Sequence, residues 1–225
     1  FCQVFSEMIE QEQIRSEIMN FWVEIFILYL KTDSFSLVLF TLTATTMIIK
    51  REELKTPLFL IFEQNENRSE IIKLYLNISI HEEFCKLLQD IYPAFLNDGL
   101  ITIDDLSTLW KSQQVIHISL LPSLLSIFIS IANTVSDESS DKFTNMILDN
   151  NYLTEEWLKC VVQIALKLNN RKQNVSKYTD FFTRISSGKF NFGNLNSKEI
   201  ESFKKIAEEV LPQLVTNSFD SQNYL

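Results

Sequence analysis

The sequence predicts an all-α protein built from stacked antiparallel helices, and three observations support this fold class. Glycine contributes only 3 and proline only 4 of the 225 residues, so strands with tight turns and glycine-rich phosphate loops are disfavoured. Apolar residues recur every three or four positions, which is the spacing of one helix face. Short links between these periodic segments force consecutive helices to pack side by side. We expect roughly ten helices in a solenoid, with a closed helical bundle as the alternative.

Apolar spacing and capping signals place these helices in chain order. The first of them has a candidate break near Asn20, and the others are separated by short polar links. The expected helices span residues 2–31, 34–50, 57–64, 68–78, 81–97, 102–110, 115–134, 138–149, 154–168, 176–187 and 196–214.

Three helix starts carry explicit signals. Asn196 and Glu199 have the spacing of a capping box, and Pro212 is expected to kink or end the helix that follows. Thr154 is an expected N-cap, followed by two glutamates that face the positive end of the helix dipole. Thr102 is another expected N-cap, and the buried face of its helix continues to Trp110, which we expect to be a core anchor.

The repeat signal is the spacing of similar tryptophan-containing helices. Trp22 and Trp157 begin similar phrases, and Trp110 and Trp157 lie about 47 residues apart, within the length of HEAT and armadillo units. We therefore expect a HEAT- or armadillo-like solenoid. Residues 1–217 are expected to form a single array cut from a larger protein, and residues 218–225 a polar tail.

Composition excludes several classes of partner. The formal net charge of −9 disfavours nucleic acid and anionic membrane surfaces, because both attract clustered Lys and Arg. The three cysteines (Cys2, Cys85 and Cys160) are odd in number and widely separated, which favours a reducing compartment over a disulfide framework. No signal peptide is recognisable. We expect an intracellular monomer, cytoplasmic or alternatively nuclear.

The longest uncharged stretch, 25 residues between Lys111 and Asp137, raises the question of a membrane span. Its polar residues are spaced alternately by four and three positions, so they form one narrow helical stripe. The stripe comprises Ser119, Ser123, Ser126, Ser130 and Asn133. Charged amphipathic segments on either side favour a central buried helix of a soluble protein over a membrane span.

No constellation of residues predicts catalysis or metal binding. His81 and Cys85 share a helix face at the i, i+4 spacing of two zinc ligands, but His117 is the only other histidine. Cys85 and Cys160 lie inside apolar helices without a positioned base, and Asp104 with Asp105 reads as helix N-terminal charge. We therefore expect no catalytic, cofactor-binding or metal-binding residues and no cofactor.

Two links stand out as candidate interaction segments. Ser136–Asp141 is acidic and is expected to cap the following helix, with phosphorylation or a basic partner as the alternative role. The segment from Ser186 to Asn196 contains two glycines, Phe190 and Phe192. We expect these two rings to fold back onto neighbouring helices, the alternative being a peptide anchor.

One region resembles a known family. The stretch from Phe95 to Gln113, the apolar run from Leu120 to Ala132 and the helix opened by Thr154 resemble the helical-repeat region of giant fat-facets-type ubiquitin-specific proteases. The resemblance covers residues 93–170. The catalytic Cys and His boxes of that family have no counterpart in this chain.

The resemblance implies a non-catalytic scaffold region of a large cysteine-type deubiquitinase, which binds protein partners such as ubiquitinated substrates. The alternative is an acidic HEAT-type transport or adaptor solenoid that binds basic protein partners. Sequence encoded downstream of Leu225 distinguishes them, because catalytic boxes support the first and further repeats the second.

Overall fold

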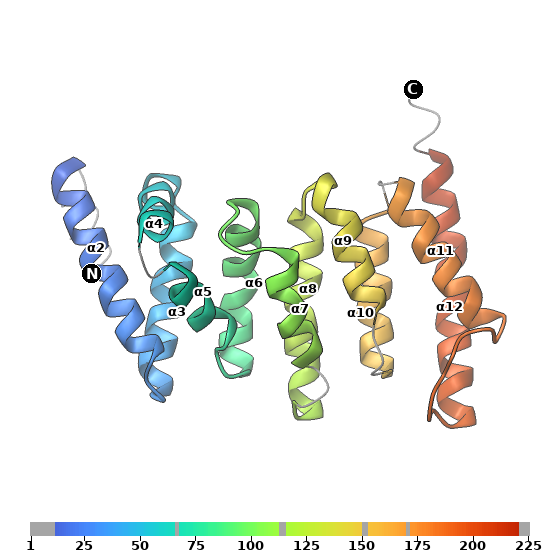
Figure 1. Cartoon of the computed structure of the whole chain (residues 1–225). Helices are drawn as coiled ribbons and strands as arrows, with labels where there is room; N and C mark the ends of the chain where they lie inside the picture. The colour runs from blue at the N-terminus through green and yellow to red at the C-terminus, as the bar shows by residue number, and fades with distance from the viewer. Residues whose placement is uncertain (1–11, 66–67, 113–115, 150–152, 170–171, 221–225) are drawn as a thin grey trace. The chain divides into compact units, whose positions relative to one another are not determined.

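The computed structural model describes residues 12–65, 68–112, 116–149, 153–169 and 172–220. Over these ranges every regular element is helical, which confirms the all-α, solenoid-like fold class. The elements are α2 (Glu12–Leu30), α3 (Phe35–Ile49), α4 (Glu52–Gln64), α5 (Arg68–Leu76), α6 (Glu82–Asn97), α7 (Ile103–Ser112), the 3-10 helix η1 (Ile118–Leu120), α8 (Leu121–Thr134), α9 (Asp137–Leu148), α10 (Glu155–Lys167), α11 (Lys172–Ser186) and α12 (Ser197–Asp220) (Figure 1).

The chain divides into two compact units, Phe1–Thr102 and Ile103–Leu225. Unit 1 contains α2–α6, and unit 2 contains α7–α12. The single array expected over residues 1–217 stays a prediction.

Unit 1 packs α2 against α3, α4 and α5, while α3 also contacts α4 and α6. Its core is aromatic: the ring centroid of Phe95 lies 5.9 Å from that of Phe62 and 5.1 Å from that of Tyr75. The two tyrosine hydroxyls in this core are satisfied. Tyr75 shares a 2.7 Å hydrogen bond with the Thr45 hydroxyl, and Tyr92 donates to the Tyr75 carbonyl at 2.8 Å. The polar atoms of these aromatic side chains are thereby buried without loss of their hydrogen bonds.

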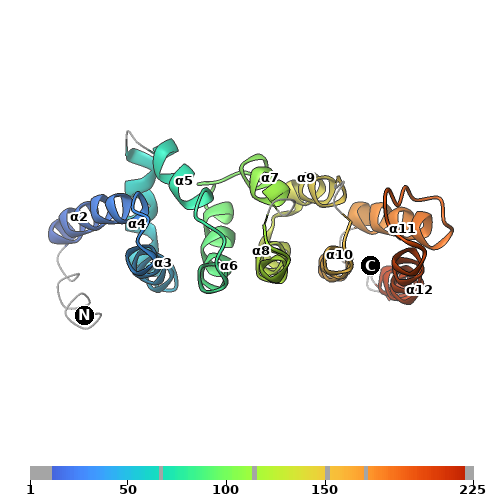
Figure 2. The same cartoon turned by 90° about the horizontal axis from the view of Figure 1, so that it is seen from below.

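Unit 2 is a two-layer stack of helix pairs. Its first layer runs α7, α9, α11 and its second α8, α10, α12, with contacts between successive helices of each layer (Figure 2). The first-layer helices begin at Ile103, Asp137 and Lys172, a repeat of about 34 residues. Trp110 lies in the first layer and Trp157 in the second, so their spacing does not join equivalent positions.

The two tryptophans of unit 2 are core anchors. Trp110 is 1% exposed and packs edge-to-face on Phe128, with ring centroids 4.7 Å apart. Trp157 is fully buried and packs against Phe181 in the same manner at 6.0 Å. The prediction that Trp110 is a buried anchor is confirmed.

Two helix boundaries in unit 1 differ from the sequence prediction. The helix α2 continues through the exposed Asn20, and α4 begins five residues before Pro57. The expected helix over residues 57–64 therefore begins too late. Glu52 and Glu53 form the first turn of α4 instead.

The prediction that the last helix ends near Leu214, close to Pro212, is wrong. The helix α12 runs on to Asp220, which includes the first residues of the expected polar tail; residues 221–225 lie outside the described part. Pro212 is on the exposed side, while Val210 and Leu214 are buried on either side of it. Packing of these neighbours holds the helix although proline removes one backbone hydrogen bond.

The expected helix over residues 115–134 is also corrected. His117 caps the short η1, and α8 begins only at Leu121, with Pro122 in its first turn. The polar stripe is exposed or half-buried, and the leucine, isoleucine and phenylalanine side chains of α8 form the buried face. The stripe therefore lies opposite the buried face of the helix. Among the described helices none has the length and apolar character to cross a membrane.

Candidate functional site

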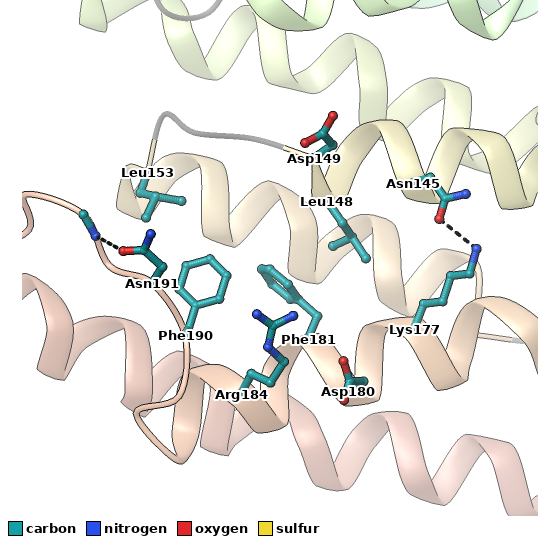
Figure 3. A pocket seen from close by; sticks show the side chains of 11 residues that line it. Asn145, Leu148, Asp149, Leu153, Lys177, Asp180, Phe181, Arg184, Phe190 and Asn191 are labelled. Atoms are coloured by element: carbon teal, nitrogen blue, oxygen red, sulfur yellow. Dashed lines mark hydrogen bonds between the residues drawn. The ribbon is translucent and has the colours of Figure 1, made fainter.

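Unit 2 has a hollow between α9, α11 and the link that follows α11. We call it the α9–α11 hollow; its volume is about 640 Å³ (Figure 3). This size falls within the range of small-molecule and peptide side-chain sites. Its lining residues are Asn145, Leu148, Asp149, Leu153, Lys177, Asp180, Phe181, Arg184, Phe190, Asn191 and Gly193.

The link after α11 is shaped by its glycines. Gly188 has a positive φ of 71° and ends α11: its N–H donates to the Ile185 carbonyl at 3.1 Å, and the next N–H donates to the Arg184 carbonyl at 2.9 Å. This pair of hydrogen bonds is a Schellman motif, which favours glycine at the left-handed position. The chain is thereby turned back toward the side of α11 that faces the hollow.

The aromatic side chains of the link fold back, as expected from the sequence. The ring centroid of Phe190 lies 5.4 Å from that of Phe181 on α11 and 5.4 Å from that of Phe192. Phe192 in turn lies 6.4 Å from Phe203 of α12. Each pair is edge-to-face, an arrangement that stabilises by about 0.5–1.5 kcal/mol beyond the area buried. Phe190 is thus held as part of the wall of the hollow.

The capping box predicted at the end of this link is confirmed. The Asn196 side chain accepts hydrogen bonds from the N–H groups of Lys198 and Glu199, at 3.0 and 3.1 Å. Glu199 returns the contact by accepting from the Asn196 N–H at 2.8 Å. The link is therefore fixed at both ends by helix-capping hydrogen bonds, which set the position of the residues between.

Of the charged side chains that line the α9–α11 hollow, Lys177 forms an ion pair within the described residues and the others do not. The Lys177 ammonium contacts Asp141 at 2.5 Å and donates to the Asn145 side-chain oxygen at 2.7 Å. The side chains of Asp149, Asp180 and Arg184 make no ion pair within the described residues. With Lys177 neutralised, an entering ligand meets two carboxylates and one guanidinium beside two aromatic rings.

A smaller hollow of about 280 Å³ lies between α7 and α9. It shares Asn145 and Asp149 with the larger one, so the two hollows flank the C-terminal part of α9. Asp104 lines it and forms an ion pair with Lys142 at 2.5 Å. Asp104 and Asp105 lie in the first turn of α7, as the sequence predicts.

Ser136 and Thr154 are helix N-caps, as the sequence predicts. The Ser136 hydroxyl accepts from the Ser139 N–H at 3.2 Å as the N-cap of α9, and Asp137–Asp141 belong to that helix. The Thr154 hydroxyl accepts from the Trp157 N–H at 3.1 Å. Both hydroxyl groups therefore accept a hydrogen bond from the first turn of their helix.

The histidines are also caps. His81 precedes α6, and its Nδ1 accepts from the Glu83 N–H at 3.3 Å, while His117 accepts from the Ser119 N–H at 3.3 Å. Cys85 is fully buried and therefore does not share an accessible face with His81. Within the described residues there is no group of three or more His, Cys, Asp or Glu side chains placed to hold a metal ion.

The described thiols are buried as small apolar groups. Burial raises the pKa of Cys85 to about 11, and burial likewise raises the pKa of Cys160, whose Sγ donates to the Leu125 carbonyl at 3.6 Å. Such thiols are protonated at neutral pH and are poor nucleophiles. Cys2 lies outside the described residues.

Sequence reasoning singled out Phe190 but missed Asp149, Asp180 and Arg184. Asp180 and Arg184 are spaced i, i+4 around Phe181, which is a weak signal because such spacing is common on solvated helix faces. Asp149 joins them only because α9 packs beside α11.

No family model matches the chain, and no curated protein sequence matches it.

Proposed function

We propose that this chain is a non-catalytic interaction scaffold and that the α9–α11 hollow receives a segment of a protein partner. The observation that carries the proposal is the composition of the hollow. Two carboxylates and a guanidinium that have no ion-pair partner among the described residues surround a wall made by Phe181 and Phe190. Aromatic rings beside a few unpaired charges bind peptide segments, since the rings supply contact area and the charges supply orientation.

The arrangement supports binding and not group transfer. The thiols of Cys85 and Cys160 are buried, and burial raises the pKa of each. Both histidines act as helix caps through Nδ1. A nucleophile needs an adjacent base and access to the substrate, and these residues have neither.

For the parent protein we propose a large ubiquitin-specific protease in which this helical region, as a HEAT- or armadillo-like scaffold, positions ubiquitinated substrates in the cytoplasm or nucleus. The support is the resemblance over residues 93–170. The complete reading frame of the parent tests this part: catalytic Cys and His boxes support it, and their absence refutes it.

A second candidate is an acidic adaptor solenoid that binds basic protein partners. It is favoured by the net charge of −9 and by Asp149 and Asp180, which line the hollow and have no ion-pair partner in the described part of the chain. Both candidates use the same hollow and predict a partner segment with a Lys or Arg side chain beside an apolar one.

The hollow is tested with a fluorescein-labelled, unstructured peptide of Lys, Gly and Phe, titrated with the chain and followed by anisotropy. The double variant Asp149→Asn and Asp180→Asn keeps side-chain shape and removes both charges. We expect it to weaken peptide binding by about 5- to 30-fold, as the loss of two partly exposed charge contacts implies.

The matched control is the double variant Glu208→Gln and Glu209→Gln, which removes the same charge from exposed positions of α12. It should leave binding within about twofold. Equal weakening by both double variants would show a general charge effect and refute the assignment to the hollow.

A further inference from the structure

The outward faces of α2 and α3 in unit 1 carry large apolar side chains where an ordinary surface helix is polar. Phe21 is 59% and Leu28 62% exposed on α2, and Phe40 is 41% and Met47 43% exposed on α3. Phe21 and Leu28 are seven residues apart, as are Phe40 and Met47, so each pair lies on one side of its helix. We call this set the α2–α3 apolar face.

Aromatic contacts join the two helices at this face. The Phe40 ring lies 6.3 Å from the Trp22 ring and 6.0 Å from the Tyr29 ring, measured between centroids. Phe21 adjoins Trp22 on the same helix, with centroids 6.4 Å apart. A contiguous apolar patch is typical of a surface that another element covers, whereas apolar residues scattered singly are not.

Within the described side chains, the cations beside the face are already held in ion pairs, whereas two glutamates are not. Lys31 contacts Glu70 at 2.7 Å and Lys50 contacts Asp90 at 2.6 Å, so the cations at the ends of α2 and α3 are already paired. The exposed side chains of Glu17 and Glu24 make no ion pair within the described residues. The helix α3 itself contains no charged residue. Among the side chains that the structure describes, the unpaired charge beside the apolar face is therefore negative.

We propose that the α2–α3 apolar face docks an amphipathic helix of a partner protein whose apolar stripe is flanked by Lys or Arg. An apolar stripe with an i, i+3, i+4, i+7 spacing covers Phe21, Leu28 and Phe40, and its basic flank meets Glu17 and Glu24. A second copy of this chain is a poor occupant. Symmetric pairing of the face would place its acidic rim near that of the other copy, between chains of net charge −9.

The probe for this proposal is a labelled leucine–alanine–lysine peptide about 18 residues long, because shorter isolated helices are marginal in water. A sister peptide carries glutamate in place of every lysine. We expect the 225-residue chain to bind the lysine peptide about tenfold more tightly than the sister peptide, with the preference decreasing as salt is raised.

Two double variants test the apolar and the acidic side chains of the face separately. Phe21→Ser with Leu28→Ser alters only exposed side chains and should abolish binding of both peptides. Glu17→Lys with Glu24→Lys should reverse the preference, so that the glutamate peptide binds more tightly. The control, Glu208→Lys with Glu209→Lys on α12, makes the same change in net charge and should keep the preference of the parent chain.

Binding that survives the serine variant, or a preference that both charge variants reverse equally, would overturn the proposal. Sedimentation of the chain without peptide gives a further outcome. A parent dimer that the serine variant converts to a monomer would assign the face to a second copy and also overturn it. The Asp149→Asn and Asp180→Asn variant should bind the lysine peptide normally, since the two surfaces belong to different units.

Discussion

Replacing Trp110 by alanine tests the packing of unit 2 most directly. The indole is 1% exposed and packs edge-to-face on Phe128 of α8 at 4.7 Å. Truncating a buried tryptophan costs about 3–5 kcal/mol. The lost aromatic pair, worth about 0.5–1.5 kcal/mol, places the expected cost in the upper half of that range.

The assay is thermal unfolding of the full chain by circular dichroism, with the region of unfolding located by hydrogen exchange. A loss of this size lowers the midpoint of a unit of about 120 residues by about 15–20 °C. The transition should also broaden as coupling between neighbouring helix pairs weakens. Amides of α8 and α9 should lose protection, whereas those of α3 and α4 should keep it.

Phe21→Ala is the control, because this aromatic side chain is 59% exposed and its truncation should cost less than about 1 kcal/mol. If Trp110→Ala melts like the parent chain and instead loses binding of a partner, Trp110 is a surface residue. The helix-pair arrangement of α7 and α8 would then be incorrect.

Two further predictions concern stability. The thiol of Cys85 has its pKa raised by burial from 9.0 to about 11, so above pH 9 the unfolded chain releases a proton that the folded chain retains. The contribution of this group to stability is therefore constant well below pH 9 and falls above it, by up to about 1.4 kcal/mol per pH unit, and buried Cys160 acts in the same direction. Urea unfolding on either side of pH 9 measures the fall, and an unchanged midpoint contradicts it. Asn196→Ala removes the acceptor for the Lys198 and Glu199 N–H groups and should cost about 0.5–2 kcal/mol by calorimetry, whereas the exposed Lys198→Ala should be nearly neutral.

The features that the sequence predicts correctly depend on neighbouring residues. The Asn196–Glu199 capping box, the Thr154 cap and the buried face that includes Trp110 each involve positions within one or two helix turns. The hydrogen-bonding capacity and apolar spacing of those positions are local properties, so they are readable without knowing the fold.

The features that the sequence does not predict depend on which helix lies beside which. Asp149 and Asp180 line one hollow because α9 packs on α11, and no local pattern encodes that contact. The continuation of α12 through Pro212 has the same origin, since the burial of Val210 and Leu214 outweighs the missing backbone hydrogen bond. The outward placement of the serine stripe follows from the larger apolar area on the opposite side of α8.

Exposed ion pairs and a hydrogen bond join successive helices of unit 2. Lys142 joins α9 to α7 through Asp104, and Lys177 joins α11 to α9 through Asp141. In the second layer, Lys167 of α10 donates to Asn133 of α8 at 2.7 Å. Exposed ion pairs are worth only about 0–1 kcal/mol and are screened over about 8 Å at physiological ionic strength. We therefore expect added salt to lower the resistance of α7, α9 and α11 to sliding past one another. The α9–α11 hollow would then widen as α9 and α11 shift, while the buried contacts of Trp110 and Trp157 stay in place.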